Sequence, residues 1–168
     1  ITYGDWSSDV CSSDLFTGFR KEQIQRKLDG FGYLIPAKEK RTILGTIWSS
    51  AIFPGRAPDG HEAFTTFVGG SRQPELMDNN DEQITALVLS ELQSIIGIHG
   101  SPSFVKIIRW QKAIPQYNVG YYKTLQAMDR FEQNFQRAFF CSNFRGGISV
   151  GDCVMNAEQV TQKILQLS

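Results

Sequence analysis

The sequence predicts an α+β protein whose antiparallel strands come before a closing unit of strand, glycine turn and helix. Three observations predict this order. Aromatic and β-branched runs alternate with turn residues between positions 30 and 68, which is typical of antiparallel strands. An apolar stripe at helical spacing then covers residues 84–96. Finally, residues 138–167 join an apolar run to a second helical pattern through two adjacent glycines.

The first strands are predicted as a hairpin followed by a loop and a third strand. Residues 30–36 and residues 42–48 are short aromatic and aliphatic runs, and the charged residues 38–41 between them form the expected turn. Prolines and glycines break both helix and strand patterns in residues 53–60, which are therefore a loop. Residues 63–68 give the third strand.

A helix is predicted to start at Asn79 or Asn80 and to end at Gly97. Asparagine is a good N-cap, acidic residues follow it in the first turn, and glycine commonly ends a helix. The predicted buried stripe recurs at three- and four-residue steps and comprises Ile84, Leu87, Val88, Leu92, Ile95 and Ile96.

The rest of the chain is predicted as strand, helix, strand and helix. Residues 104–110 read as a strand, and residues 121–132 as a helix that buries Leu125, Met128 and Phe131. Residues 138–141 are predicted to form a buried strand. The last helix places Cys153, Ala157, Val160, Ile164 and Leu167 on one face.

Composition excludes several classes of protein. With 41% hydrophobic and 20% charged residues, the chain is neither disordered nor collagen-like. Its 17 basic and 17 acidic residues give no reason to expect nucleic acid as a partner. The three cysteines and two histidines lack the clustering of a metal site, so no metal is expected. Without a secretion signal or an apolar run of about 20 residues, a cytoplasmic location is expected.

Residues 1–15 are predicted to be a non-native or disordered tail. The stretch from Asp5 to Leu15 is rich in serine and aspartate and shows no periodic apolar face. It is similar to the in-frame translation of a sequencing adapter, which would place a truncation of the gene at Phe16. A natural polar tail is the alternative. In either case the stretch gives no evidence about the fold.

One segment, residues 141–152, has the features of a ligand site. Gly146 and Gly147 let the backbone approach a ligand without interference from a Cβ atom. The helix that follows offers unpaired N–H groups and the positive end of its dipole, which stabilise an anion. A simple tight turn is the alternative interpretation.

The string from Asn143 to Cys153 resembles the C-terminal flavin segment of protoporphyrinogen oxidases. Other blocks resemble the same family in the same order, namely residues 30–36, 44–46, 53–58 and 65–72. The resemblance to the FAD-dependent protoporphyrinogen and coproporphyrinogen oxidases extends from Phe16 to the C-terminus. It implies a fragment of an amine-oxidase-like FAD/NAD(P)-binding fold. Residues 16–110 would supply substrate-domain strands and an amphipathic helix, and residues 111–168 the C-terminal part of the FAD-binding domain.

The resemblance also implies roles for individual residues. The FAD-binding residues carried over by position are Asn143, Gly146, Gly147, Ile148, Ser149 and Val150. In the family, the helix N-terminus faces the N1–C2=O2 edge of the flavin. Phe31, Leu34 and Phe53 would line the tetrapyrrole pocket, with ordinary core packing as the alternative. Arg56 and Arg72 would meet substrate propionates or simply solvate the surface.

The activity implied by the resemblance is oxidation of a porphyrinogen to the porphyrin in haem biosynthesis, with molecular oxygen reoxidising FAD. Either protoporphyrinogen IX or coproporphyrinogen III would be the substrate, and no catalytic base is identified. A G-x-G-x-x-G fingerprint is absent from the chain and is expected in a missing N-terminal half. The fragment alone is therefore expected to be inactive, and peripheral membrane association would suit an apolar substrate. The alternatives are an amine oxidase, a carotenoid desaturase, or a non-enzymatic interaction domain.

Overall fold

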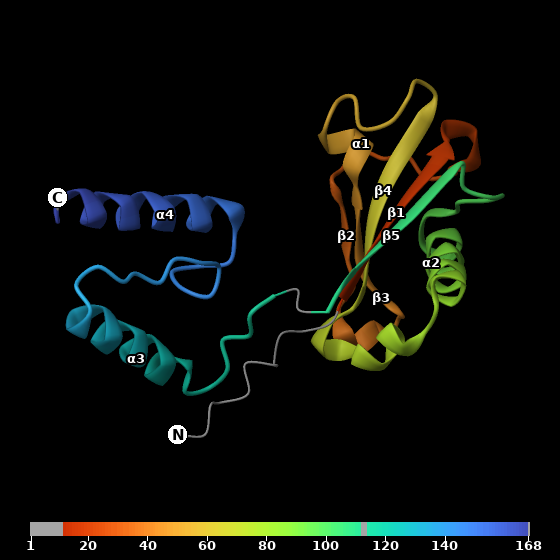
Figure 1. The fold of residues 1–168 in the computed structure, drawn as a ribbon. Coiled ribbons are helices and arrows are strands. Elements are labelled where there is room, and N and C mark those ends of the chain that lie inside the picture. The colour runs from red at the N-terminus through yellow and green to blue at the C-terminus, as the bar shows by residue number, and fades with distance from the viewer. Residues whose placement is uncertain (1–11, 112–113, 168) are drawn as a thin grey trace. The chain divides into compact units, whose positions relative to one another are not determined.

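The computed structural model describes residues 12–111 and 114–167, and these fall into two compact units divided between the two ranges. The first unit contains five strands in the order β2-β3-β4-β1-β5, and all neighbours are antiparallel (Figure 1). The strands are β1 Ser12–Arg20, β2 Gly32–Leu34, β3 Ile43–Trp48, β4 His61–Gly69 and β5 Phe104–Trp110. The antiparallel sheet, the β2–β3 hairpin and the strand at residues 104–110 are thus confirmed.

Short helical turns connect these strands. They are the 3₁₀ helices η2 Lys21–Gln23, η3 Ala37–Glu39, η4 Gly70–Arg72 and η5 Pro74–Asp78, and the short α-helix α1 Ser49–Ile52. In the hairpin, η3 ends at Lys40, whose φ of 51° is left-handed. The charged residues predicted as a turn therefore form a 3₁₀ turn with one left-handed residue.

The structure differs from the predicted tail at its end, because β1 begins at Ser12. Ser13 and Leu15 are fully buried and continue the alternation of Thr17 and Phe19 toward the core. These residues also pair with β4 on one side and β5 on the other, so their backbone groups are satisfied within the sheet. The strand pattern is not apparent in the sequence here, because serine is a small polar residue and gives no apolar signal. Residues 1–11 of the predicted tail lie outside the described residues.

Helix α2, Asp81–Ile96, covers one face of the sheet and closes the core. Asn80 caps it, since its Oδ1 accepts from the Gln83 N–H at 2.9 Å, and Gly97 ends it with a left-handed φ of 70°. The predicted helix is confirmed at both ends. Its buried residues are Ile84, Val88, Leu92 and Ile96, which share the core with residues of β1, β3 and β4 such as Leu15, Phe19, Ile43, Trp48, Phe64 and Val68.

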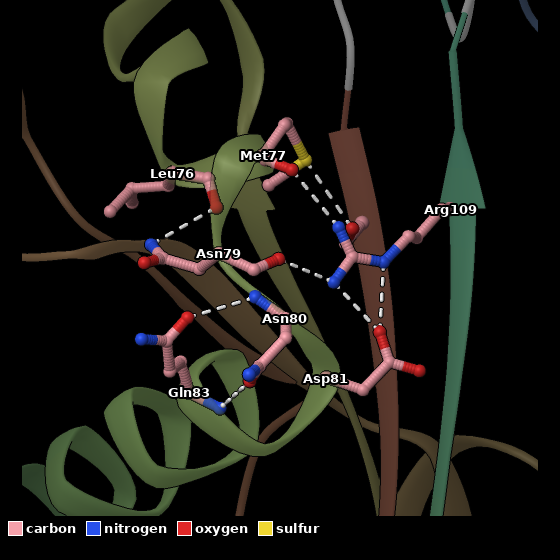
Figure 2. Close-up of polar contacts among 8 residues, drawn as sticks. Leu76, Met77, Asn79, Asn80, Asp81, Gln83 and Arg109 are labelled. Carbon is pink, nitrogen blue, oxygen red and sulfur yellow. Dashed lines mark hydrogen bonds and ion pairs between the residues drawn. The ribbon is translucent and has the colours of Figure 1, made fainter.

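Arg109 on β5 fixes the start of α2 (Figure 2). Its guanidinium donates to Asp81 Oδ1 at 2.8 Å and to the carbonyls of Met77 at 3.0 Å and Asn79 at 2.7 Å. One side chain thus ties the strand to Met77 in η5, to Asn79 and to the first residue of α2. These carbonyls and the Asp81 carboxylate receive charge-assisted hydrogen bonds, which are stronger than neutral ones.

We expect Arg109→Ala to lower the free energy of unfolding of the first unit by about 1–2 kcal/mol, because these hydrogen bonds are lost while the site stays partly solvated. Urea unfolding followed by tryptophan fluorescence measures this change. Lys106→Ala, which removes an exposed cation from the same strand, is the control and should stay within about 0.5 kcal/mol of the wild type. Equal losses of unfolding free energy in the two variants would show that these hydrogen bonds of Arg109 do not stabilise the first unit.

The second unit contains α3, Tyr121–Asn134, and α4, Val150–Leu165. Both predicted helices are confirmed. The predicted strand at residues 138–141 is wrong, because this segment is irregular and Cys141 is exposed. A strand needs a neighbouring strand for its backbone groups, and no strand among the described residues pairs with this segment.

Burial in the second unit is also lower than predicted. Met128 is buried in α3, but Phe131 is 43% exposed. Helix α4 has no buried residue, and Val150 at its start is 82% exposed. The apolar faces read from the sequence are therefore present but largely uncovered within this unit. No helix in the described ranges has the length and apolar character needed to cross a bilayer.

Candidate functional site

The glycine loop, residues 142–149, joins the segment after α3 to the start of α4. Gly146 and Gly147 have φ values of 84° and 133°, which side chains rarely allow. A Cβ atom at Gly147 would lie 2.4 Å from the Asp152 carboxyl carbon. The close approach that requires glycine at position 147 is therefore to the carboxylate of Asp152 on α4.

Ser149 is the N-cap of α4, and its hydroxyl is engaged in capping the helix. Its Oγ accepts from the Asp152 N–H at 3.0 Å, and Asp152 Oδ2 accepts from the Ser149 N–H at 3.2 Å. The Asp152 carboxylate thus lies at the positive end of the helix dipole. The N-terminus of α4 thus already has an acidic residue of its own, and its contact with a bound anion stays a prediction.

Arg145 anchors the centre of the loop to α3. Its guanidinium forms ion pairs with Asp129, at 2.6 Å, and with Glu132. Glu132 also accepts from the Phe140 N–H at 2.7 Å. Partial burial opposes ionisation of Glu132, but the hydrogen bonds from Arg145 and Phe140 hold its pKa below the ordinary value.

Two stacked tyrosines and an asparagine hold the loop carbonyls. The Tyr117 hydroxyl donates to the Asn143 carbonyl at 2.8 Å, and the Tyr121 hydroxyl donates to the Phe144 carbonyl. The two rings lie 5.0 Å apart between centroids. Asn156 on α4 donates from Nδ2 to the Arg145 carbonyl at 2.7 Å. Three consecutive carbonyls are thus fixed, so the second unit orders the glycine loop with its own side chains.

Arg145, Tyr121 and Asn156 were not predicted as supports of this loop. A signal was available for Arg145: an arginine inside a glycine turn, preceded by a helix with acids three residues apart at Asp129 and Glu132. The six predicted FAD-binding residues do gather in the loop and the first turn of α4. Among them Ile148 and Val150 present exposed apolar side chains, whereas Ser149 is engaged in capping. Their contact with a flavin stays a prediction.

A cavity of about 690 Å³ lies on the first unit. The strands contribute Phe16, Ile47, Thr65 and Phe104, and the loop after α1 contributes Phe53, Arg56, Ala57 and Pro58. Phe16 pairs with Thr65, and Thr65 pairs with Ile47, so their side chains share one sheet face. Leu15 alternates with Phe16 and points into the core, which places the cavity on the face opposite α2.

The structure separates the predicted substrate residues. Phe53 lines the cavity and is 51% exposed. Leu34, at 81% exposed, pairs with Gly45 and lies outside the cavity lining. Phe31, at 72% exposed, is also outside it. The structure therefore brings Phe53 to the cavity and does not gather Phe31 and Leu34 with it.

Polar groups at the cavity edge are mostly paired with one another. The Ser50 hydroxyl donates to the Glu62 carboxylate, and Lys21 Nζ lies 3.6 Å from the other Glu62 oxygen. The Ser49 and Thr65 hydroxyls are hydrogen-bonded at 2.8 Å. The cavity thus has an apolar floor and an edge whose acid already has partners. This suits a large apolar ligand.

Comparison with known proteins covers both units. The chain matches the flavin containing amine oxidoreductase family over residues 12–165. It is 41% identical to protoporphyrinogen oxidase 2, chloroplastic/mitochondrial, of Arabidopsis thaliana over 145 residues, which are 84% of this chain and 28% of that protein. It is 24% identical to coproporphyrinogen III oxidase of Bacillus subtilis (strain 168) over 138 residues, which are 82% of this chain and 29% of that protein.

A solved structure from Exiguobacterium sp. 255-15 shares the fold, with a TM-score of 0.78 at 21% identity over 95% of this chain and 35% of that one. The chain thus spans less than a third of its curated relatives. The family match includes the cavity, the glycine loop and the strand β1. The predicted amine-oxidase-like fold is confirmed, and the chain belongs to the flavin containing amine oxidoreductase family.

Proposed function

We propose that the complete protein carrying this chain oxidises a porphyrinogen to the porphyrin in haem biosynthesis. The observation that carries the proposal is the 41% identity to the Arabidopsis relative, which is named a protoporphyrinogen oxidase, across 84% of this chain. This similarity favours a porphyrinogen over the substrates of amine oxidases or carotenoid desaturases. Both protoporphyrinogen IX and coproporphyrinogen III remain candidate substrates, since a coproporphyrinogen III oxidase is also related.

The residues of the glycine loop fit the flavin end of FAD. The loop is ordered by Tyr117, Tyr121 and Arg145, and it carries two glycines with positive φ. FAD, when bound, supplies the acceptor for the hydride removed from the substrate. The described residues contain no G-x-G-x-x-G fingerprint, so we assign the adenine and pyrophosphate contacts to an N-terminal half. Molecular oxygen is the proposed final acceptor.

Within this chain, the proposed role of the residues is to bind and orient the substrate and the flavin. The apolar cavity with Phe53 at its edge holds the porphyrinogen ring and excludes water from the reacting carbon. The glycine loop positions the flavin. For localisation, we propose a cytoplasmic enzyme in peripheral contact with the membrane, where an apolar product partitions.

The proposal is tested by assaying the complete, FAD-loaded protein with protoporphyrinogen IX and coproporphyrinogen III. Porphyrin fluorescence and oxygen consumption should rise together, because the non-fluorescent porphyrinogen becomes a conjugated ring as oxygen is reduced. The matched control is the same protein with a known amine substrate. Oxygen consumption with the amine and none with either porphyrinogen would contradict the proposed substrate class.

A second expectation concerns the chain by itself. Residues 12–167 alone should bind FAD at least about 100-fold more weakly than the complete protein, because the contacts to adenine and pyrophosphate are missing. Titration of flavin fluorescence in both proteins measures the ratio. Equal affinities would contradict the assignment of those contacts to another half.

A further inference from the structure

The cavity edge carries a cation whose position is set by an aromatic ring. Arg56 lines the cavity, and its guanidinium carbon lies 5.5 Å from the centroid of the Phe53 ring. The Arg56 N–H donates to the Phe53 carbonyl at 3.3 Å, so a tight turn through Gly55, with φ of 80°, keeps the two side chains together. An arginine over an aromatic face keeps its hydrogen-bonding edge available to a ligand.

Arg56 differs from three other arginines of the same unit. Arg41 pairs with Glu91, Arg109 pairs with Asp81, and Arg72 donates to the Ile35 carbonyl at 2.6 Å. Among the residues that line the cavity, Arg56 is the one lysine or arginine, and no ion pair joins it to an acid in the described ranges.

Glu62, the acidic residue that lines the cavity, pairs with Lys21 and not with Arg56. Glu62 is engaged by Ser50 and by Lys21 on the opposite side of the carboxylate. The cavity edge therefore combines an apolar surface, a satisfied acid and a cation without a counter-ion. A ligand that matches this pattern is an apolar ring with a carboxylate at its periphery.

We propose that Arg56 binds a propionate carboxylate of the tetrapyrrole while Phe53 contacts its ring. This inference rests on the proposed function and adds a specificity-determining residue to it. Of the two arginines considered in the sequence analysis for this role, the structure favours Arg56, because Arg72 is bonded to the backbone of Ile35. A guanidinium can bind a carboxylate through two parallel hydrogen bonds, which gives direction as well as affinity.

The test compares the free acid of the porphyrinogen with its dimethyl ester in the complete, FAD-loaded protein. Arg56→Ala should raise KM for the free acid about tenfold and leave KM for the ester unchanged, with little effect on kcat. The KM of Arg56→Lys for the free acid should lie between those of the wild type and Arg56→Ala, since lysine keeps the charge and loses the two-point geometry. Arg26→Ala removes an exposed cation from the same unit away from the cavity lining and should leave both KM values unchanged.

A second measurement reads the same contact without turnover. Quenching of tryptophan fluorescence by protoporphyrin IX and by its dimethyl ester gives the two dissociation constants in each variant. The wild type should prefer the free acid, and Arg56→Ala should lose that preference. Equal effects of Arg56→Ala on acid and ester, or no effect on either, would overturn the proposal. A wild type that prefers the free acid without oxidising any porphyrinogen would count against the proposed function and leave the carboxylate contact intact.

Discussion

Gly147→Ala is expected to weaken FAD binding by the complete protein about 100-fold. Gly147 has a φ of 133°, and an added Cβ would lie 2.4 Å from the Asp152 carboxyl carbon. Both the backbone strain and the collision would displace the Asp152 carboxylate, which accepts from the N–H of the N-cap Ser149. The combined cost is about 2–3 kcal/mol, which is comparable with the expected loss of affinity. Titration with FAD measures it.

The matched control for this substitution is Gly151→Ala, four residues later in α4. Its backbone is helical, and the nearest atom to an added Cβ is Ser149 Oγ at 3.7 Å, an ordinary contact. Alanine there should raise helix stability by about 0.5–1 kcal/mol and leave FAD affinity unchanged. If Gly147→Ala kept the wild-type affinity as well, the loop would not be the flavin-binding element.

Arg145→Ala is expected to release the glycine loop from α3. The side chains of Arg145 and Glu132 are 20% and 13% exposed, so the substitution leaves a mostly buried carboxylate without its cation. We expect a loss of about 2 kcal/mol, seen as roughly 30-fold faster amide hydrogen exchange in residues 142–149. Arg130→Ala on the exposed side of α3 is the control and should leave the exchange rates unchanged. Equal exchange in all three proteins would show that the loop is ordered without Arg145.

The same ion pair predicts a pH dependence. The pKa of Glu132 in the folded protein lies below its ordinary value of 4.5, because Arg145 and the Phe140 N–H stabilise the carboxylate more than burial opposes it. Its contribution is therefore fully present above that ordinary value and is lost as the pH falls through the lowered one. Protection of the loop amides should decline in this acidic range. Glu132→Gln should remove most of that decline, and an unchanged decline in this variant would assign it to another group.

The elements predicted correctly are those whose signals are local. The boundaries of α2 depend on Asn80, Gln83 and Gly97, which lie within the helix or next to it. Strands β3 and β5 were readable because their aliphatic and aromatic runs are bounded by turns. The strand Ser12–Arg20 was not predicted: its first residues were assigned to the tail, and Ser13, buried between two neighbouring strands, carries no apolar signal.

The features that could not be predicted depend on contacts with residues that are distant in the chain or absent from the described residues. Residues 138–141 have the composition of a buried strand, yet no described strand pairs with them. The flavin site at the glycine turn stays a prediction, and the structure adds a reason for Gly147, a contact with Asp152 that spacing alone did not reveal. Arg56 and Arg72 were indistinguishable in sequence, because their difference is a tertiary hydrogen bond to Ile35.

We propose that this chain is the C-terminal part of a porphyrinogen-oxidising flavoenzyme, and sequencing the source DNA upstream of Phe16 tests this proposal most directly. We expect the stretch from Asp5 to Leu15 to be replaced by natural sequence that keeps small or apolar residues where Ser13 and Leu15 lie buried. Farther upstream, in the same reading frame, we expect a strand–helix unit with G-x-G-x-x-G. An intact stretch preceded directly by a start codon would contradict the claim, because the chain would then lack the dinucleotide-binding half that the proposed oxidation requires.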